Sequence, residues 1–74
     1  MNTMFEKEIG QRIRCFREKK NLTQEQLSAQ MQVNGCDITR SALAKIEVGQ
    51  RHIYPDEIQL FVRLLSITYS DLLD

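Results

Sequence analysis

Residue types that hold metals or act as nucleophiles are scarce in this chain of 74 residues. It has two cysteines, one histidine and no tryptophan. Cys15 and Cys36 stand apart, no carboxylate is arranged near His52, and these side chains make no ligand set for zinc. We therefore expect free thiols and no metal. No base stands at a supporting spacing to Ser41 or Ser66, so we expect no catalytic activity and no cofactor.

Long apolar runs are also missing. No stretch approaches the roughly 20 apolar residues of a membrane-spanning helix, and no secretion signal is visible, so we expect a cytoplasmic protein. The chain has three glycines, one proline and no low-complexity run, which argues against general disorder. Strand-like alternation is absent as well. The 42% hydrophobic content is enough for a compact core, and we expect one all-α domain over residues 1–74.

The formal net charge is zero, which at first argues against a nucleic-acid partner. The charges are unevenly distributed, however. Residues 1–52 hold nine Lys and Arg against six Asp and Glu, whereas residues 53–74 hold one against four. This polarity favours a local basic face in the first two thirds of the chain.

Apolar residues recur at helical spacing in five segments. The pattern predicts helices over residues of about 4–20, 24–32, 40–47, 56–65 and 69–73. Asn21 is suited to end the first helix, and Thr23 with Gln26 predicts a capping box at the start of the second. Thr39 is a candidate N-cap for the third helix, and Gly49 is a candidate stop.

The third segment is the most informative about function. Leu43 and Ile46, three residues apart, predict an inward apolar face. The residues on the outward side are Arg40, Ser41, Ala44 and Lys45. A narrow helix end with a long cation, a hydroxyl and a small side chain suits the DNA major groove, where Arg and Lys read guanine.

Four stretches of the chain resemble the phage-repressor and Cro-like (XRE) helix-turn-helix family. They are Ile9 to Arg14 with Arg17, Leu22 to Leu27, Thr39 to Glu47 with Gly49, and Leu65 to Leu73. Together they follow the family's order of five helices over nearly the whole chain. The resemblance implies a compact, lambda-repressor-like bundle of five short helices. It also implies a sequence-specific transcriptional regulator, a repressor that binds double-stranded DNA at a near-palindromic operator as a homodimer.

The resemblance also implies roles for particular residues. Base edges would be read by Arg40, Ser41, Ala44 and Lys45. DNA phosphates would be contacted by Thr23, Gln24, Thr39, Gly49, Gln50, Arg51 and His52. Arg17 and Glu47 match a buried ion pair that ties the first helix to the third in some members, which accounts for an arginine beside the apolar stripe.

The turn before the third helix departs from the family's usual pattern. Gln32 stands where glycine is usual, and residues 33–38 make the turn several residues longer. A subset of the family resembles this longer form, including the sequence Arg-Ser-Ala-Leu-Ala-Lys-Ile-Glu at residues 40–47. The longer turn bears on the angle between the two helices, and it is a further candidate for contact with the DNA backbone.

Two questions stay open at this level. One is whether an additional stripe belongs to the core or forms a homodimer seam; its residues are Leu60, Leu64, Tyr69 and Leu72. The other is whether the fold serves instead as a protein-interaction module or antitoxin-type subunit, with DNA binding secondary. The zero net charge and the Leu60 and Leu64 stripe favour that second class.

Overall fold

A computed structural model describes residues 3–74, with side chains from residue 5 onward. It contains α1 (Thr3–Lys19), α2 (Gln24–Val33), α3 (Arg40–Glu47), α4 (Pro55–Leu65) and α5 (Tyr69–Leu73). No strand occurs in this range, so the predicted all-α class is confirmed. Residues 1 and 2, which the predicted domain includes, lie outside the described residues. Within residues 3–74 no helix combines the length and apolar character that crossing a membrane requires.

Local capping explains where the helices begin and end. Asn21 follows α1 in the left-handed conformation, with a φ of 57°. The Thr23 hydroxyl accepts from the Gln26 N–H at 3.0 Å while the Gln26 side chain accepts from the Thr23 N–H at 2.8 Å, which completes the predicted capping box. Thr39 accepts from the Ala42 N–H at the start of α3. These caps satisfy N–H groups that a helix start leaves without partners.

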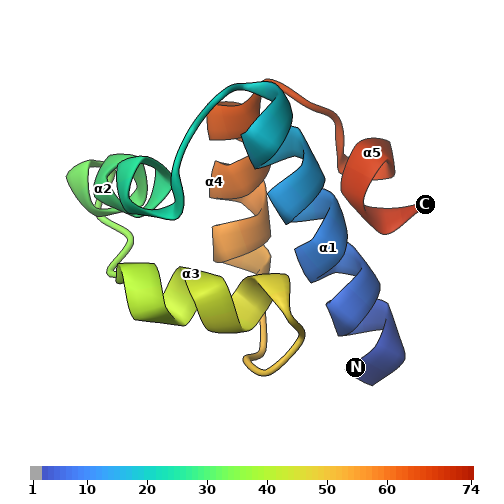
Figure 1. Ribbon diagram of the computed structural model, residues 1–74. Coiled ribbons are helices and arrows are strands. Elements are labelled where there is room, and N and C mark those ends of the chain that lie inside the picture. The colour runs from blue at the N-terminus through green and yellow to red at the C-terminus, as the bar shows by residue number, and fades with distance from the viewer. Residues whose placement is uncertain (1–2) are drawn as a thin grey trace.

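The five helices surround one apolar core (Figure 1). Helices α2 and α3 lie to one side of α1, and α5 packs against its other side. Phe61 of α4 is among the largest fully buried side chains. The core further includes Ile9, Ile13, Leu27, Met31, Ile38, Leu43, Ile46 and Leu72, all 0% exposed. The inward face predicted for α3 therefore packs into this core.

A glycine fixes how closely α1 and α3 approach. A Cβ atom at Gly10 would clash with the backbone carbonyl of Ile46. Only glycine lacks this atom, so the two backbones can come together here. This contact sets the position of α3 relative to α1.

The longer turn is closed by its own hydrogen bonds. The Cys36 N–H donates to the Met31 carbonyl at 2.9 Å, and the Gln32 side chain donates to the Ile38 carbonyl at 3.1 Å. Gly35 has a φ of +84°, which glycine adopts without strain. Ile38 is fully buried beyond the turn, so the extra residues still deliver Thr39 to its capping position.

Two residues of the candidate seam belong to the core instead. Leu72 is 0% exposed and Leu60 is 8% exposed within the single chain, and both pack in its apolar core. Leu64 is half-buried, and Tyr69 is 48% exposed. The core alternative therefore holds for Leu60 and Leu72.

Candidate nucleic-acid interface

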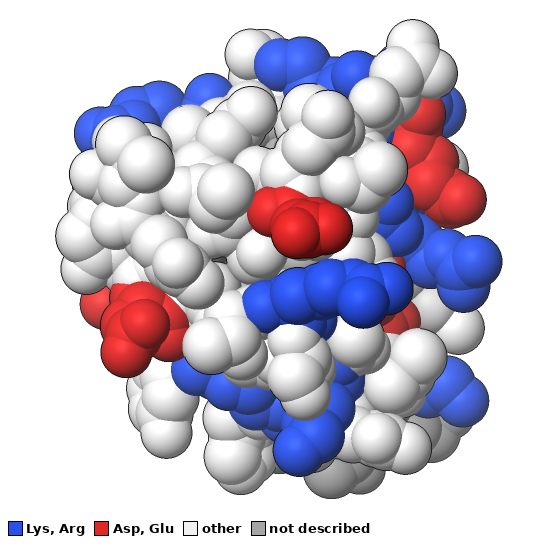
Figure 2. All heavy atoms as spheres, turned by 60° about the vertical axis from the view of Figure 1, so that its left-hand side comes forward, with Lys and Arg blue, Asp and Glu red and all other residues white. Residues whose placement is uncertain are grey.

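The outward face of α3 carries the predicted base-reading residues. Arg40, Ser41 and Lys45 are exposed, and Ala44 is half-buried. Figure 2 turns the α2 and α3 side of the molecule forward, and Lys and Arg side chains spread over this face with a few acidic ones between them. Arg40 and Lys45 are the two exposed cations that α3 contributes to this side of the molecule.

A hollow of about 450 Å³ lies between α2 and α3. Its lining residues are Gln24, Arg40, Ser41 and Ala44. The structure therefore brings three of the four predicted base-reading residues together with one predicted phosphate contact. Lys45 is exposed but does not line this hollow.

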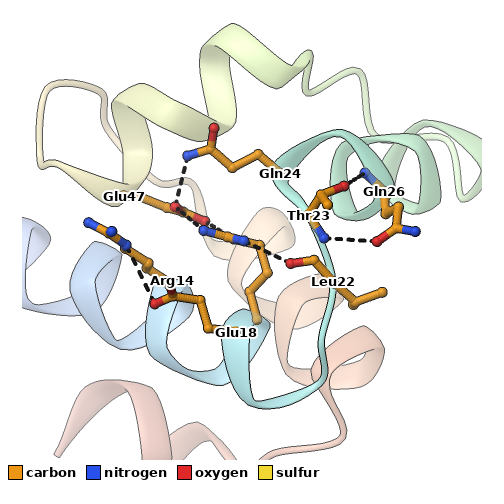
Figure 3. Close-up of polar contacts among 8 residues, drawn as sticks. Arg14, Glu18, Leu22, Thr23, Gln24, Gln26 and Glu47 are labelled. Carbon is orange, nitrogen blue, oxygen red and sulfur yellow. Dashed lines mark hydrogen bonds and ion pairs between the residues drawn. The ribbon is translucent and has the colours of Figure 1, made fainter.

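An ion pair and its hydrogen bonds connect α1, α2 and α3 next to this hollow (Figure 3). The Arg17 Nε donates to Glu47 Oε2 at 2.7 Å, and a second guanidinium nitrogen donates to Oε1 at 3.1 Å. The Gln24 side-chain amide also donates to Glu47 Oε1, at 3.0 Å. A third Arg17 contact runs to the Leu22 carbonyl at 2.8 Å. Arg17 from α1 and Glu47 from α3 thus meet, and Gln24 joins α2 to them.

Burial makes this contact consequential. Glu47 is 2% exposed and Arg17 is 8% exposed. The hydrogen bond to Glu47 raises the pKa of the Arg17 guanidinium above its ordinary value. Because Glu47 accepts from two side chains, its buried charge is satisfied, and the end of α3 is fixed against α1 and α2.

Two predicted phosphate contacts after α3 already have partners within the chain. Arg51 donates to Glu57 at 2.9 and 3.0 Å and to the His52 carbonyl at 2.8 Å. His52 Nδ1 lies 2.7 Å from an oxygen of Glu6 on α1. The loop between α3 and α4 is thereby tied to both α4 and α1.

Titration of the Arg51 pair follows from its geometry. Burial alone raises the pKa of the Glu57 carboxyl, but hydrogen bonds from Arg51 and the Tyr54 N–H outweigh that effect and lower the pKa below its ordinary value. The hydrogen bond to Glu57 raises the pKa of Arg51. Both groups are therefore held in their charged forms.

The remaining predicted phosphate contacts lie at helix ends. Thr23 and Thr39 are the N-caps of α2 and α3. Gly49 has a φ of +79°, and a Cβ there would approach the Lys7 side chain at 2.8 Å, so glycine is required. Gln50 is exposed, with its N–H donating to the Lys45 carbonyl.

Sequence reasoning missed both carboxylates that contact this loop, Glu57 of α4 and Glu6 of α1. The expectation that no carboxylate lies near His52 is wrong, because Glu6 contacts it from 46 residues away and is 3% exposed. Glu57 was not paired with Arg51 either. Its position in the first turn of α4, where it accepts from the Tyr54 N–H, was a usable local signal.

Helices α2 and α3, joined by a turn with the polar side of α3 outward, have the arrangement of a helix-turn-helix domain. In DNA-binding domains of this class, the second of the two helices lies in the major groove. Residues 10–74 match the family described as helix-turn-helix domain. The chain is also 35% identical over 67 residues to control protein C.BamHI of Bacillus amyloliquefaciens. The aligned region covers 89% of this chain and 76% of that protein. No solved structure matches the chain.

The chain belongs to the XRE helix-turn-helix family, as the sequence motifs indicated. It is a DNA-binding transcriptional regulator.

Proposed function

We propose that the chain represses transcription by occupying a near-palindromic operator as a homodimer. The observation that carries this proposal is the outward end of α3, where Arg40 and Ser41 are exposed beside the hollow shared with Gln24. In this proposal base edges are read by Arg40, Ser41, Ala44 and Lys45. Such a regulator acts where the DNA is, so we expect it in the cytoplasm or nucleoid, without catalytic activity.

The phosphates on either side of the read bases would be held by the helix ends and the loop after α3. The proposed contacts are Thr23, Gln24, Thr39, Gly49, Gln50, Arg51 and His52. Arg51 uses three hydrogen bonds within the chain, and a guanidinium has five N–H donors. It therefore keeps donors for a phosphate while Glu57 fixes its position.

A homodimer is proposed because one module of this size reads few base pairs. An apolar groove of about 310 Å³ offers a seam. It is lined by Phe5, Ile9, Ile53, Pro55, Ile58, Tyr69 and Leu73. Of the predicted seam residues, Tyr69 lines this groove, whereas Leu64 is half-buried and does not line it. Two copies related by a two-fold axis would present their α3 helices to half-sites about one helical turn apart.

The same groove supports a second candidate function. An apolar surface in a chain of zero net charge also suits a different protein chain, as in an antitoxin-type subunit with secondary DNA binding. The two candidates differ in what covers the groove and in how strongly the chain selects DNA.

Selection from a random DNA library at moderate salt separates them. The proposal predicts a two-fold symmetric site whose half-sites are about 10 base pairs apart. Placing that site over a promoter should then lower transcription from a reporter. An unselected pool, together with a tight protein partner covering the groove, would favour the second candidate.

A further inference from the structure

A second hollow, of about 600 Å³, lies between α1 and the start of α2. Its lining residues are Arg14, Arg17, Thr23, Gln24, Glu25 and Arg40. We propose that this cleft holds one backbone phosphate of the DNA and that Arg14 of α1 is the residue that grips it. The proposal rests on the operator-binding function above and adds Arg14, to which neither the motifs nor the resemblance assigned a role.

The three arginines of the cleft are not equivalent. Arg17 is 8% exposed, and three of its N–H groups donate to Glu47 and the Leu22 carbonyl. Its charge is neutralised by Glu47. Arg14 and Arg40 therefore supply the attraction for an anion, against Glu25 among the lining residues. This small excess of positive charge suits a single phosphodiester.

Arg14 is available for such a contact at little cost. Its partner within the chain is Glu18, one helical turn on, with Nε and Oε1 3.5 Å apart. The side chains are 58% and 57% exposed, so solvent screens this pair, and it contributes little to stability. Figure 3 shows Arg14 projecting from α1 near the Arg17–Glu47 pair. Its guanidinium can exchange Glu18 for a phosphate and bind it through two N–H groups.

The layout of the two hollows separates phosphate binding from base reading. Gln24 and Arg40 line both hollows, whereas Arg14 lines the α1 cleft and Ser41 and Ala44 line the other. If Ser41 and Ala44 contact a base, the sugar-phosphate backbone of that nucleotide would lie beyond Gln24 and Arg40. This places the backbone over Arg14. Arg14 should therefore strengthen binding to every sequence alike, because phosphates carry no sequence information.

The test measures binding of Arg14→Ala to the selected site and to an unrelated duplex over a range of salt concentrations. Losing one phosphate contact should reduce the slope of log K against log salt by about 0.9 per protomer. Affinity for both duplexes should fall by a similar factor, and the order of preferred bases should not change. Arg14→Lys should keep most of the slope, because lysine also contacts phosphates as a point charge.

Arg63→Ala is the matched control. Arg63 is an exposed arginine on α4 that contacts Asn34 and lines neither hollow. Arg63→Ala removes the same charge as Arg14→Ala, but at a position outside the proposed phosphate cleft. We therefore expect Arg63→Ala to keep the wild-type slope of log K against log salt. A thermal melt of each variant checks that the fold is kept.

Three results would overturn the phosphate cleft. They are an unchanged slope for Arg14→Ala, a reduction matched by Arg63→Ala, and a loss confined to the selected sequence. Failure of the wild-type chain to bind DNA at all would remove the operator function and the cleft together. Normal selection by the wild type with normal binding by Arg14→Ala would remove the cleft alone.

Discussion

At the scale of single residues, Glu47 links α1, α2 and α3. Its carboxylate is 2% exposed and accepts from Arg17 of α1 and Gln24 of α2. A buried ion pair of this kind adds little net stability over an apolar pair, but the loss of one partner leaves the other charge buried without compensation. The geometry of the hollow under Arg40 depends on this side chain.

Glu47→Gln should destabilise the protein by about 3–5 kcal/mol, because it strands the Arg17 guanidinium. Urea unfolding followed by circular dichroism measures the change. Glu18→Gln is the matched control, since it removes the carboxylate of an exposed pair and should cost less than about 1 kcal/mol. Equal losses in the two variants would mean that burial of the Arg17–Glu47 pair has no energetic weight.

Glu57 should make stability depend on pH in acid. Its pKa is lowered in the folded state, so the unfolded chain takes up the proton first as pH falls. The stabilising contribution is complete above the ordinary carboxyl pKa of about 4.3 and is lost as pH falls through the folded-state value. Glu57→Gln should therefore be less stable at neutral pH and lose less stability on acidification.

Thermal melts of Glu57→Gln over a pH series, with Asp56→Asn as control, test this account. Asp56 is an exposed carboxylate in the same turn of α4. We expect Asp56→Asn to keep the acid dependence of the wild type. If the melting temperatures of Glu57→Gln and the wild type fell in parallel as the pH was lowered, the assigned role of the Arg51–Glu57 pair would be wrong.

At the scale of helices, the boundaries could be predicted from local chemistry, whereas the contacts between distant residues could not be predicted from the sequence. The boundaries of α2 and α3 follow from Thr23, Gln26 and Thr39, which act on N–H groups a few residues away. The same local reasoning applies where α4 starts at Pro55, whose missing N–H costs nothing at the first helical position. Helical periodicity indicated the inward face of α3, but it carries no information on which distant side chains meet.

Contacts across the fold account for what the sequence left open. His52 meets Glu6 from another helix, and nothing in the spacing of either residue points to the other. The choice between core and seam for Leu60 and Leu72 depended on how α4 and α5 pack. The Arg17–Glu47 pairing was accessible through the family resemblance, whereas the cleft around Arg14 required coordinates.

Gly10 allows α1 to approach α3 closely. Gly10→Ala tests that claim, because the sign of the change in stability depends on whether the added methyl group fits. Alanine normally stabilises a helix by about 0.5–1 kcal/mol relative to glycine. Gly10→Ala should instead destabilise by about 1–3 kcal/mol, because the added methyl group meets the Ile46 carbonyl. Gln11→Ala, at the exposed neighbouring position, serves as control in the same denaturation experiment. A gain in stability for Gly10→Ala would show that the helices have room to adjust.

At the scale of the whole molecule, the interface and the proposed seam occupy different sides. Helices α2 and α3 carry the hollow proposed to face DNA, whereas the apolar groove is lined by α5, the first turns of α1, Ile53 and the start of α4. Figure 1 shows α5 separated from α2 by α1 and α4. A dimer through the groove therefore leaves the base-reading face of each copy uncovered.

Tyr69→Asp tests that seam. Tyrosines at interface centres often contribute about 2 kcal/mol or more, so a buried carboxylate in this place should weaken dimerisation by at least roughly tenfold. Sedimentation across a concentration series measures the change, and operator affinity should fall with it. Val33→Asp, at an apolar position 86% exposed at the end of α2, is the control for the sedimentation measurement. An unaffected dimer would place the seam elsewhere.

The central claim is that the outward end of α3 reads bases, and selection with wild-type and Arg40→Ala protein in parallel tests it most directly. The account predicts that Arg40→Ala weakens binding to the wild-type site by about 1–3 kcal/mol. It also predicts loss of preference at one base position in each half-site, with the other positions kept. Identical selected sites and affinities for the two proteins would contradict the placement of α3 in the major groove.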